Sequence, residues 1–227
     1  MDRLRAISKV VVDAIFVQIC AECERRGQWV CAVCLPSVQP IDVPGCLRCG
    51  SISASGCQCS LLPAEISRME SVYPYAGWVK SSIHRLKYNG EFARAEMLAS
   101  HLLALTDTIE SADVLIPVPM HRNRQQLRGF NQAERIARHL SNSCGIPVAS
   151  AILRTVDTGT QVGRGQSARW ESVKGAFECI DTAPIRGRNL LIVDDVITTG
   201  ATVSHCAVEL MRAGAASVSA ISIARGG

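Results

Sequence analysis

Aromatic residues are scarce in this chain, since Phe, Trp and Tyr make up only 4% of its 227 residues. Proteins that bind single-stranded nucleic acid by stacking use aromatic side chains as platforms for the bases. A base-stacking surface is therefore not expected. Long apolar runs are missing too, because no uncharged stretch approaches the roughly 20 residues of a membrane-spanning helix. The sequence predicts no membrane span.

A large excess of either charge is also missing. The chain has 24 Lys and Arg against 20 Asp and Glu, and its net charge of +4 is too small to indicate a nucleic-acid-binding protein by itself. The first nineteen residues carry five charged side chains and no clear cleavage site, so no secretory signal is recognised and we expect a cytoplasmic protein. Apolar residues make up 48%, enough for one substantial core beside a small module.

Cysteine, by contrast, is abundant: eight of the 11 cysteines fall between positions 20 and 59, and the other three are expected to be small buried residues. The eight form close pairs that are typical of zinc ligands in a cytoplasmic protein. The pairs are Cys20 and Cys23, Cys31 and Cys34, Cys46 and Cys49, and Cys57 and Cys59. The simplest assignment is two consecutive zinc ribbons with four thiolates each; crossed pairing and a single occupied site are alternatives. Four thiolates leave no open position for water, so both sites are expected to be structural.

The ribbon segment has few large apolar residues, so bound metal would supply the stabilisation that its core lacks. Its charges are balanced, with Arg25, Arg26 and Arg48 against Glu22, Glu24 and Asp42. Because nucleic-acid binding needs a basic surface, a structural or protein-binding role is favoured.

The stretch LLIVDDVITTGAT, residues 190–202, carries the clearest signal for chemistry. Its leading apolar residues predict a strand buried on both faces of a parallel sheet, and helical periodicity follows over residues 202–213. Hydroxyl residues and Gly200 at a strand-to-helix turn suit a phosphate, which backbone N–H groups and a helix N-terminus attract. Asp194 and Asp195 would repel that phosphate unless ribose hydroxyls or a divalent cation intervened. Mg²⁺ is often held by carboxylates together with ligand oxygens.

A second candidate site follows the short apolar run at residues 114–116, which predicts another strand. Residues 117–140 contain five arginines and one acidic residue. An arginine-rich loop at a strand end suits a second polyanion, here pyrophosphate. A solvated basic surface is the alternative. The basic run at residues 84–88 is interpreted as a solvated helix face.

The remaining periodicity predicts further elements of an α/β domain. Helices are expected at residues 3–19, 79–105 with a break near Asn89 and Gly90, and 130–145; strands are expected at 71–76, from Phe177, and at 217–223. Residues 157–172 contain three glycines and no periodicity, which favours a mobile lid.

These motifs resemble a known family. The order of apolar strand, two aspartates, two residues and Thr-Thr-Gly-x-Thr resembles the phosphoribosyl pyrophosphate (PRPP) motif of type I phosphoribosyltransferases. Three stretches are similar to signatures of the bacterial ComF family: residues 116–121 with 128–133 (VPVPLH…RGFNQA in the family), residues 161–177, and residues 193–202. Together with the paired cysteines, the resemblance covers nearly the whole chain.

The resemblance implies a type I phosphoribosyltransferase-like parallel sheet with flanking helices, beside a small N-terminal zinc-ribbon module. The expected divisions are a helix at residues 1–19, a double zinc ribbon at 20–62 and the phosphoribosyltransferase-like domain at 68–227. The implied activity is Mg²⁺-dependent displacement of pyrophosphate from PRPP by a base or amine. The alternative is a non-catalytic, PRPP-responsive accessory protein in competence and DNA uptake, which binds single-stranded DNA or protein partners.

Two sets of candidate site residues accompany the zinc ligands. The PRPP-binding set is Val193, Asp194, Asp195, Thr198, Thr199, Gly200, Ala201 and Thr202, in which Asp194 and Asp195 are expected to be catalytic. The pyrophosphate set is Pro117, Val118, Pro119, His121, Arg122, Arg124 and Arg128. One or two structural Zn²⁺ ions and Mg²⁺ bound with PRPP are the expected metals.

Overall fold

A computed structural model describes residues 17–41, 65–157 and 175–226 of the chain. Nearly all of the predicted helix at residues 3–19 lies outside these ranges, as does nearly all of the predicted lid at residues 157–172. The same is true of the second group of candidate zinc ligands, Cys46, Cys49, Cys57 and Cys59.

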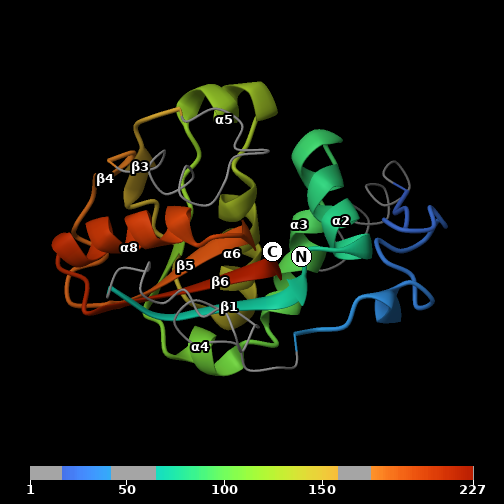
Figure 1. The fold of residues 1–227 in the computed structure, drawn as a ribbon, viewed down its shortest axis with the longest axis horizontal. Coiled ribbons are helices and arrows are strands. Elements are labelled where there is room, and N and C mark those ends of the chain that lie inside the picture. The colour runs from blue at the N-terminus through green and yellow to red at the C-terminus, as the bar shows by residue number, and fades with distance from the viewer. Residues whose placement is uncertain (1–16, 42–64, 158–174, 227) are drawn as a thin grey trace, which may run out of the picture.

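A four-stranded parallel sheet forms the centre of the molecule (Figure 1). Its strand order is β1-β6-β5-β2, with β1 at Ile66–Pro74, β6 at Ser217–Arg225, β5 at Asn189–Ile197 and β2 at Val114–Pro117. Val114 lies opposite Leu190, and Asn189 lies opposite Ser217. Because these strands are parallel, the carboxyl ends of β2 and β5 lie at the same edge of the sheet, which is where open α/β sheets bind ligands.

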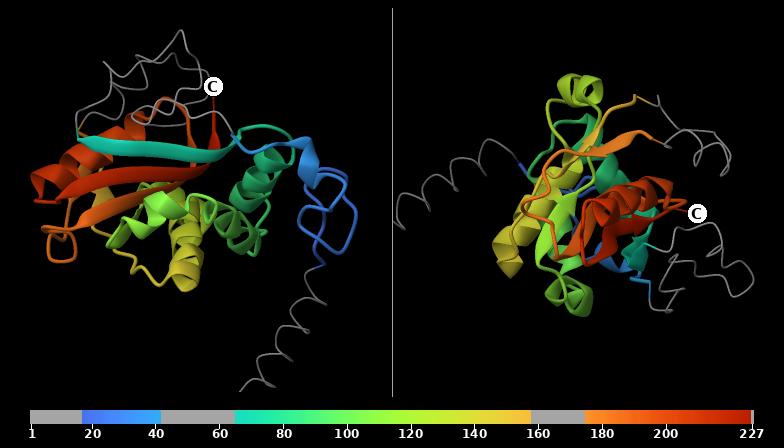
Figure 2. Two further views of the ribbon diagram at one scale, coloured as in Figure 1. Left: turned by 90° about the horizontal axis from the view of Figure 1, so that it is seen from below. Right: turned by 90° about the vertical axis from the view of Figure 1, so that its left-hand side faces the viewer.

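Helices cover both faces of the sheet (Figure 2). On one face, α3 (Arg94–Leu102) and α6 (Gln132–Cys144) pack against Leu191 and Val193 of β5. On the other face, α8 (Ala201–Arg212) packs against Leu190 and Ile192. The predicted burial of this strand on both faces is confirmed, and so are the helices that follow β2 and β5.

Three further helices lie in the chain before β2, one ahead of β1 and two after it. They are η1 (Leu35–Ser37), α2 (Gly77–Tyr88) and α4 (Thr106–Glu110). The expected strand at residues 71–76 begins earlier, at Ile66, because β1 pairs with β6 along its length. The predicted break at Asn89 and Gly90 is confirmed, since α2 ends at Tyr88.

Two segments fold differently from expectation. The arginine-rich segment expected as a loop contains a short helix, α5 (Arg122–Arg128), which the His121 ring caps by accepting from the Asn123 N–H at 3.3 Å. The strand β4 (Phe177–Cys179) does not lead into the main sheet. It pairs antiparallel with β3 (Ile152–Arg154) in a separate two-stranded sheet beside α8.

Candidate functional site

The predicted phosphate turn connects β5 to α8. Gly200 has a φ of 78°, a left-handed conformation that glycine adopts without strain, and Ala201 begins the helix directly after it. The Ala201 N–H donates to the Thr199 hydroxyl at 3.3 Å. Residues 198–202 line a small hollow of about 30 Å³ at the N-terminus of α8. The turn therefore offers hydroxyl groups and a helix N-terminus, which suit a phosphate.

From the sequence, the two aspartates were expected to follow the strand. The structure instead places them within β5, because the strand continues to Ile197. Side chains alternate between the faces of a strand, so Asp195 shares the face of Leu191 and Val193, and Asp194 shares that of Leu190 and Ile192. The pair is therefore divided between the two sides of the sheet. The Asp195 N–H still donates to the Asp194 carboxylate at 2.8 Å.

Asp195 is held by two side chains from other elements. The Lys87 ammonium at the end of α2 forms an ion pair with its Oδ2, and Gln132 Nε2 donates to its Oδ1 at 2.9 Å. Burial raises the pKa of Asp195, but the Lys87 charge and these hydrogen bonds outweigh burial and lower it. Burial and the neighbouring Asp195 charge raise the pKa of Asp194 well above its ordinary value. The two carboxylates thus differ in their environment.

A cavity of about 230 Å³ opens beside these carboxylates, at the shared carboxyl ends of β2 and β5. Its lining is mostly polar and contains four cations against two acids. The lining residues are Lys87, Tyr88, Val118, Pro119, Met120, Arg124, Arg128, Asn131, Gln132, Arg154, Asp194, Asp195, Val196 and Thr202. An anionic ligand that also carries hydroxyl groups suits this combination.

The structure brings part of the expected pyrophosphate set to this cavity. Val118, Pro119, Arg124 and Arg128 line it. Pro117 instead ends β2 opposite Val193, and His121 caps α5. Arg122 is exposed and does not line the cavity.

The RGFNQA segment, residues 128–133, connects the two halves of the site. The Asn131 side chain donates to the Val118 carbonyl at 2.9 Å and accepts from the Ala133 N–H at 3.0 Å, so it fixes the loop after β2 to the start of α6. Gln132 holds Asp195, and its Oε1 accepts from Arg128 Nη1 at 2.6 Å. One short segment therefore positions both the basic loop and the acidic strand end.

Sequence reasoning missed Lys87, which belongs to the run interpreted as a solvated face. Val79 and Ile83 are buried on α2, and Lys87 follows Ile83 by four residues, so it lies on the same side of the helix. That spacing was the available signal. Arg154 was also missed; it is largely buried and lies over the Phe177 ring at 5.5 Å.

The first four cysteines form a compact cluster. The Sγ atoms of Cys20, Cys23, Cys31 and Cys34 all lie within 4.8 Å of one another, as the ligands of one tetrahedral ion require. Burial raises the pKa of Cys20, but backbone N–H groups of Cys23, Cys31 and Glu22 outweigh it and lower this pKa to about 6. A thiolate is thereby favoured, which fits a soft metal such as zinc.

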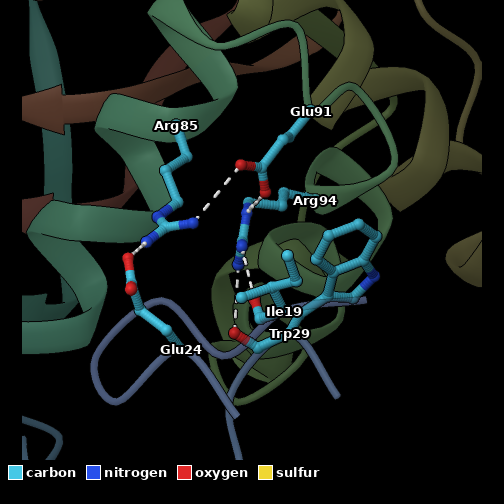
Figure 3. Close-up of polar contacts among 6 residues, drawn as sticks. All are labelled: Ile19, Glu24, Trp29, Arg85, Glu91 and Arg94. Atoms are coloured by element: carbon cyan, nitrogen blue, oxygen red, sulfur yellow. Dashed lines mark hydrogen bonds and ion pairs between the residues drawn. The ribbon is translucent and has the colours of Figure 1, made fainter. Parts of the chain in front are cut away.

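Arg94 of α3 fastens this cysteine module, residues 17–41, to the main domain (Figure 3). Its side chain is fully buried, and it donates to the carbonyls of Ile19 at 2.6 Å and Trp29 at 3.0 Å. Glu91 balances the charge at 2.6 Å, and the guanidinium lies 4.5 Å from the centre of the Trp29 ring.

Helix α2 makes further contacts with the same module. Arg85 pairs with Glu24 at 2.8 Å, and the Trp78 ring N–H donates to the Leu35 carbonyl at 3.1 Å. Helix α2 therefore contacts the cysteine module with these residues and the acidic strand end with Lys87.

Among the residues that the structure describes, no helix is long and apolar enough to cross a membrane.

The second half of the chain, residues 110–227, matches the phosphoribosyl transferase domain. Over 205 residues the chain is 35% identical to the DNA utilization protein YhgH of Shigella flexneri, an alignment that covers 85% of this chain and 88% of that one. It is 29% identical to competence protein F of Haemophilus influenzae over 86% of this chain and 90% of that one. It is also 29% identical to competence protein ComFC of Bacillus subtilis over 86% of this chain and 84% of that one.

Proposed function

Because the chain belongs to the ComF family and carries a phosphoribosyl transferase domain, we propose that it binds PRPP and acts as a Mg²⁺-dependent phosphoribosyltransferase. The observation that carries this proposal is the meeting of three features at one edge of the sheet. They are the phosphate turn at residues 198–202, the carboxylates of Asp194 and Asp195, and the cavity lined by Arg124 and Arg128.

The proposed binding mode follows the chemistry of these groups. The 5-phosphate lies in the turn before α8, the ribose hydroxyls contact the carboxylates, and the pyrophosphate extends toward Arg124 and Arg128. Carboxylates are the hard oxygen donors that Mg²⁺ prefers, so Asp194 and Asp195 are suited to a magnesium ion bound together with PRPP. Such an ion supplies positive charge for the departing pyrophosphate.

The proposed reaction forms a bond from an acceptor nitrogen to the anomeric carbon and breaks the bond from that carbon to pyrophosphate. Positive charge develops on the sugar, as in glycoside chemistry, and negative charge on the leaving group. The arginines stabilise the leaving group. A nucleobase or an amine is the proposed acceptor.

Calorimetry with PRPP and Mg²⁺ tests the assignment of the site. We expect binding by the unmodified protein and a loss of at least about tenfold in the double variant Asp194→Asn with Asp195→Asn, because two charged hydrogen bonds to hydroxyls are weakened. Unchanged affinity would contradict the site. A screen of nucleobases and amines for pyrophosphate release then tests catalysis. If none of them causes release, only the proposal of PRPP binding remains.

A second candidate function is PRPP-responsive binding of single-stranded DNA or of proteins in DNA uptake. It is supported by the similarity to a DNA utilization protein and a competence protein and by Arg122, which is exposed on α5. Binding of single-stranded DNA should fall steeply with salt, since phosphate contacts release counterions. An absence of binding at low salt would exclude direct contact and leave protein partners.

The cysteine module is proposed to be a structural zinc site, held by Cys20, Cys23, Cys31 and Cys34. We keep as proposals the second ribbon, the division into residues 1–19, 20–62 and 68–227, and a cytoplasmic location. None of the four described cysteines lines the cavity at the sheet edge, which supports a structural rather than a catalytic role for the metal.

A further inference from the structure

Lys87 lies between the helix that carries it and the acidic end of β5. Its ammonium pairs with Asp195, whose side chain is 3% exposed, while the Lys87 side chain itself is 20% exposed. We propose that Lys87 is a positioning residue of the PRPP site: it holds Asp195 in place and offsets its charge, so that Asp195 can accept hydrogen bonds from the ribose hydroxyls. This inference rests on the proposed function.

Electrostatics gives the reason for such a residue. A charged carboxylate beside PRPP, which carries a phosphate and a pyrophosphate, repels the ligand. At Asp195 the chain supplies its own counter-ion, Lys87. Asp194 lies on the other face of the sheet, accepts from the Asp195 N–H and interacts with the Lys87 charge as well.

A role in stability alone does not account for the pair. The free energy lost when two charges leave water often exceeds the attraction between them in a buried ion pair. Apolar residues of the same size often stabilise a protein equally well. The pair also does not stand alone. Gln132 contacts the second oxygen of Asp195, Arg128 contacts Gln132, and the Arg128 guanidinium lies 5.1 Å from the centre of the Tyr88 ring.

These contacts form a closed circuit of residues in the wall of the cavity. It runs from Lys87 through Asp195, Gln132 and Arg128 to Tyr88, which follows Lys87 in the chain. All five residues line the cavity. The circuit sets the hydroxyl-binding carboxylate and the pyrophosphate-binding arginine relative to one another, with Lys87 as its only cation paired to an acid in the described contacts.

The test separates the two halves of the ligand. Ribose 5-phosphate carries the hydroxyls and the phosphate, whereas inorganic pyrophosphate carries the leaving group. For Lys87→Met we expect about tenfold weaker binding of ribose 5-phosphate, measured without Mg²⁺, and little change for pyrophosphate. Lys87→Arg should restore most of the loss. Lys80→Met, which removes an exposed lysine from the same helix, is the matched control and should bind as the unmodified protein does.

A double-mutant cycle distinguishes positioning from a direct ligand contact. If Lys87 acts through Asp195, Lys87→Met should add no further loss of ribose 5-phosphate binding in an Asp195→Asn background. This neutral double variant also retains the fold if Lys87→Met alone leaves Asp195 buried without its counter-ion and unfolds. Independent losses, or a loss of pyrophosphate binding in Lys87→Met, would overturn the proposal.

Binding by the unmodified protein shows whether a negative result contradicts this proposal alone or the proposed function as well. If it binds PRPP and ribose 5-phosphate while Lys87→Met binds them equally well, the inference about Lys87 is wrong and the PRPP site stands. If it binds none of the three probes, the PRPP site itself is wrong and the inference falls with it.

Discussion

Gly200 is the residue on which the geometry of the phosphate turn depends. Its φ of 78° lies in the left-handed region, where a side chain costs roughly 1–2 kcal/mol. For Gly200→Ala we therefore expect lower stability together with weaker binding of ribose 5-phosphate, because the backbone N–H groups at the start of α8 shift. Thermal melting and calorimetry measure the two effects.

Gly145 offers a matched control for this change. It has nearly the same conformation, with a φ of 77°, and an added Cβ would meet no heavy atom within 4 Å. Because it ends α6 away from the cavity, Gly145→Ala should reduce stability by a similar amount and leave binding intact. Equal loss of binding in both variants would show that Gly200 acts only through stability.

At the scale of single residues, the sequence indicated which residues belong to the site more readily than which residues contact one another. The hydroxyls, Gly200 and the two aspartates were recognisable because their order along the chain is local. Lys87 was misinterpreted because its partner, Asp195, lies far away in the sequence and is brought close only by the sheet. The sequence also did not predict that the two aspartates lie on opposite faces of the sheet, because this depends on how far β5 continues.

Among the elements, α3 carries the contact that fastens the cysteine module. For Arg94→Met we expect the module to loosen, because two carbonyls lose a buried donor and, among the described contacts, Glu91 keeps only Arg85 as a partner; breaking a buried ion pair costs about 3 kcal/mol. Limited proteolysis within residues 17–41 should become faster. Arg212→Met, which removes an exposed arginine with the same three-residue spacing from a glutamate, is the control. Equal proteolysis of the two variants would contradict this role.

The elements that could be predicted are those whose pattern is local. The short apolar runs of β2 and β5 and the amphipathic α6 and α8 were recognised, since burial on both faces or on one stripe leaves a clear pattern. Helix α5 was not recognised, because no residue of it is buried and no apolar stripe marks it. The pairing of β4 with β3 was missed because strands of three residues carry too little pattern.

The whole molecule combines two differently stabilised parts. The main domain has a sheet buried on both faces, whereas the cysteine module has a small cluster of its own around Cys20, Cys31 and Cys34. With a chelator, or in Cys23→Ser, we expect residues 17–41 to become sensitive to protease while PRPP binding survives. Elemental analysis should find one to two zinc ions per chain. Purified protein without zinc, with a protease-resistant module that chelator does not affect, would contradict the zinc site.

The strand order also determines when a newly made chain can complete its fold. Strand β6 is synthesised after the other strands of the main sheet, yet it lies between β1 and β5. Until it leaves the ribosome, β1 lacks its neighbour and exposes Ile66 and Met69, which makes the nascent chain prone to aggregation. The four cysteines, in contrast, lie in one short stretch and can close around an ion early in translation. The cysteine module is thus expected to fold first, and α2 and α3, which follow it in the chain, are expected to dock against it next.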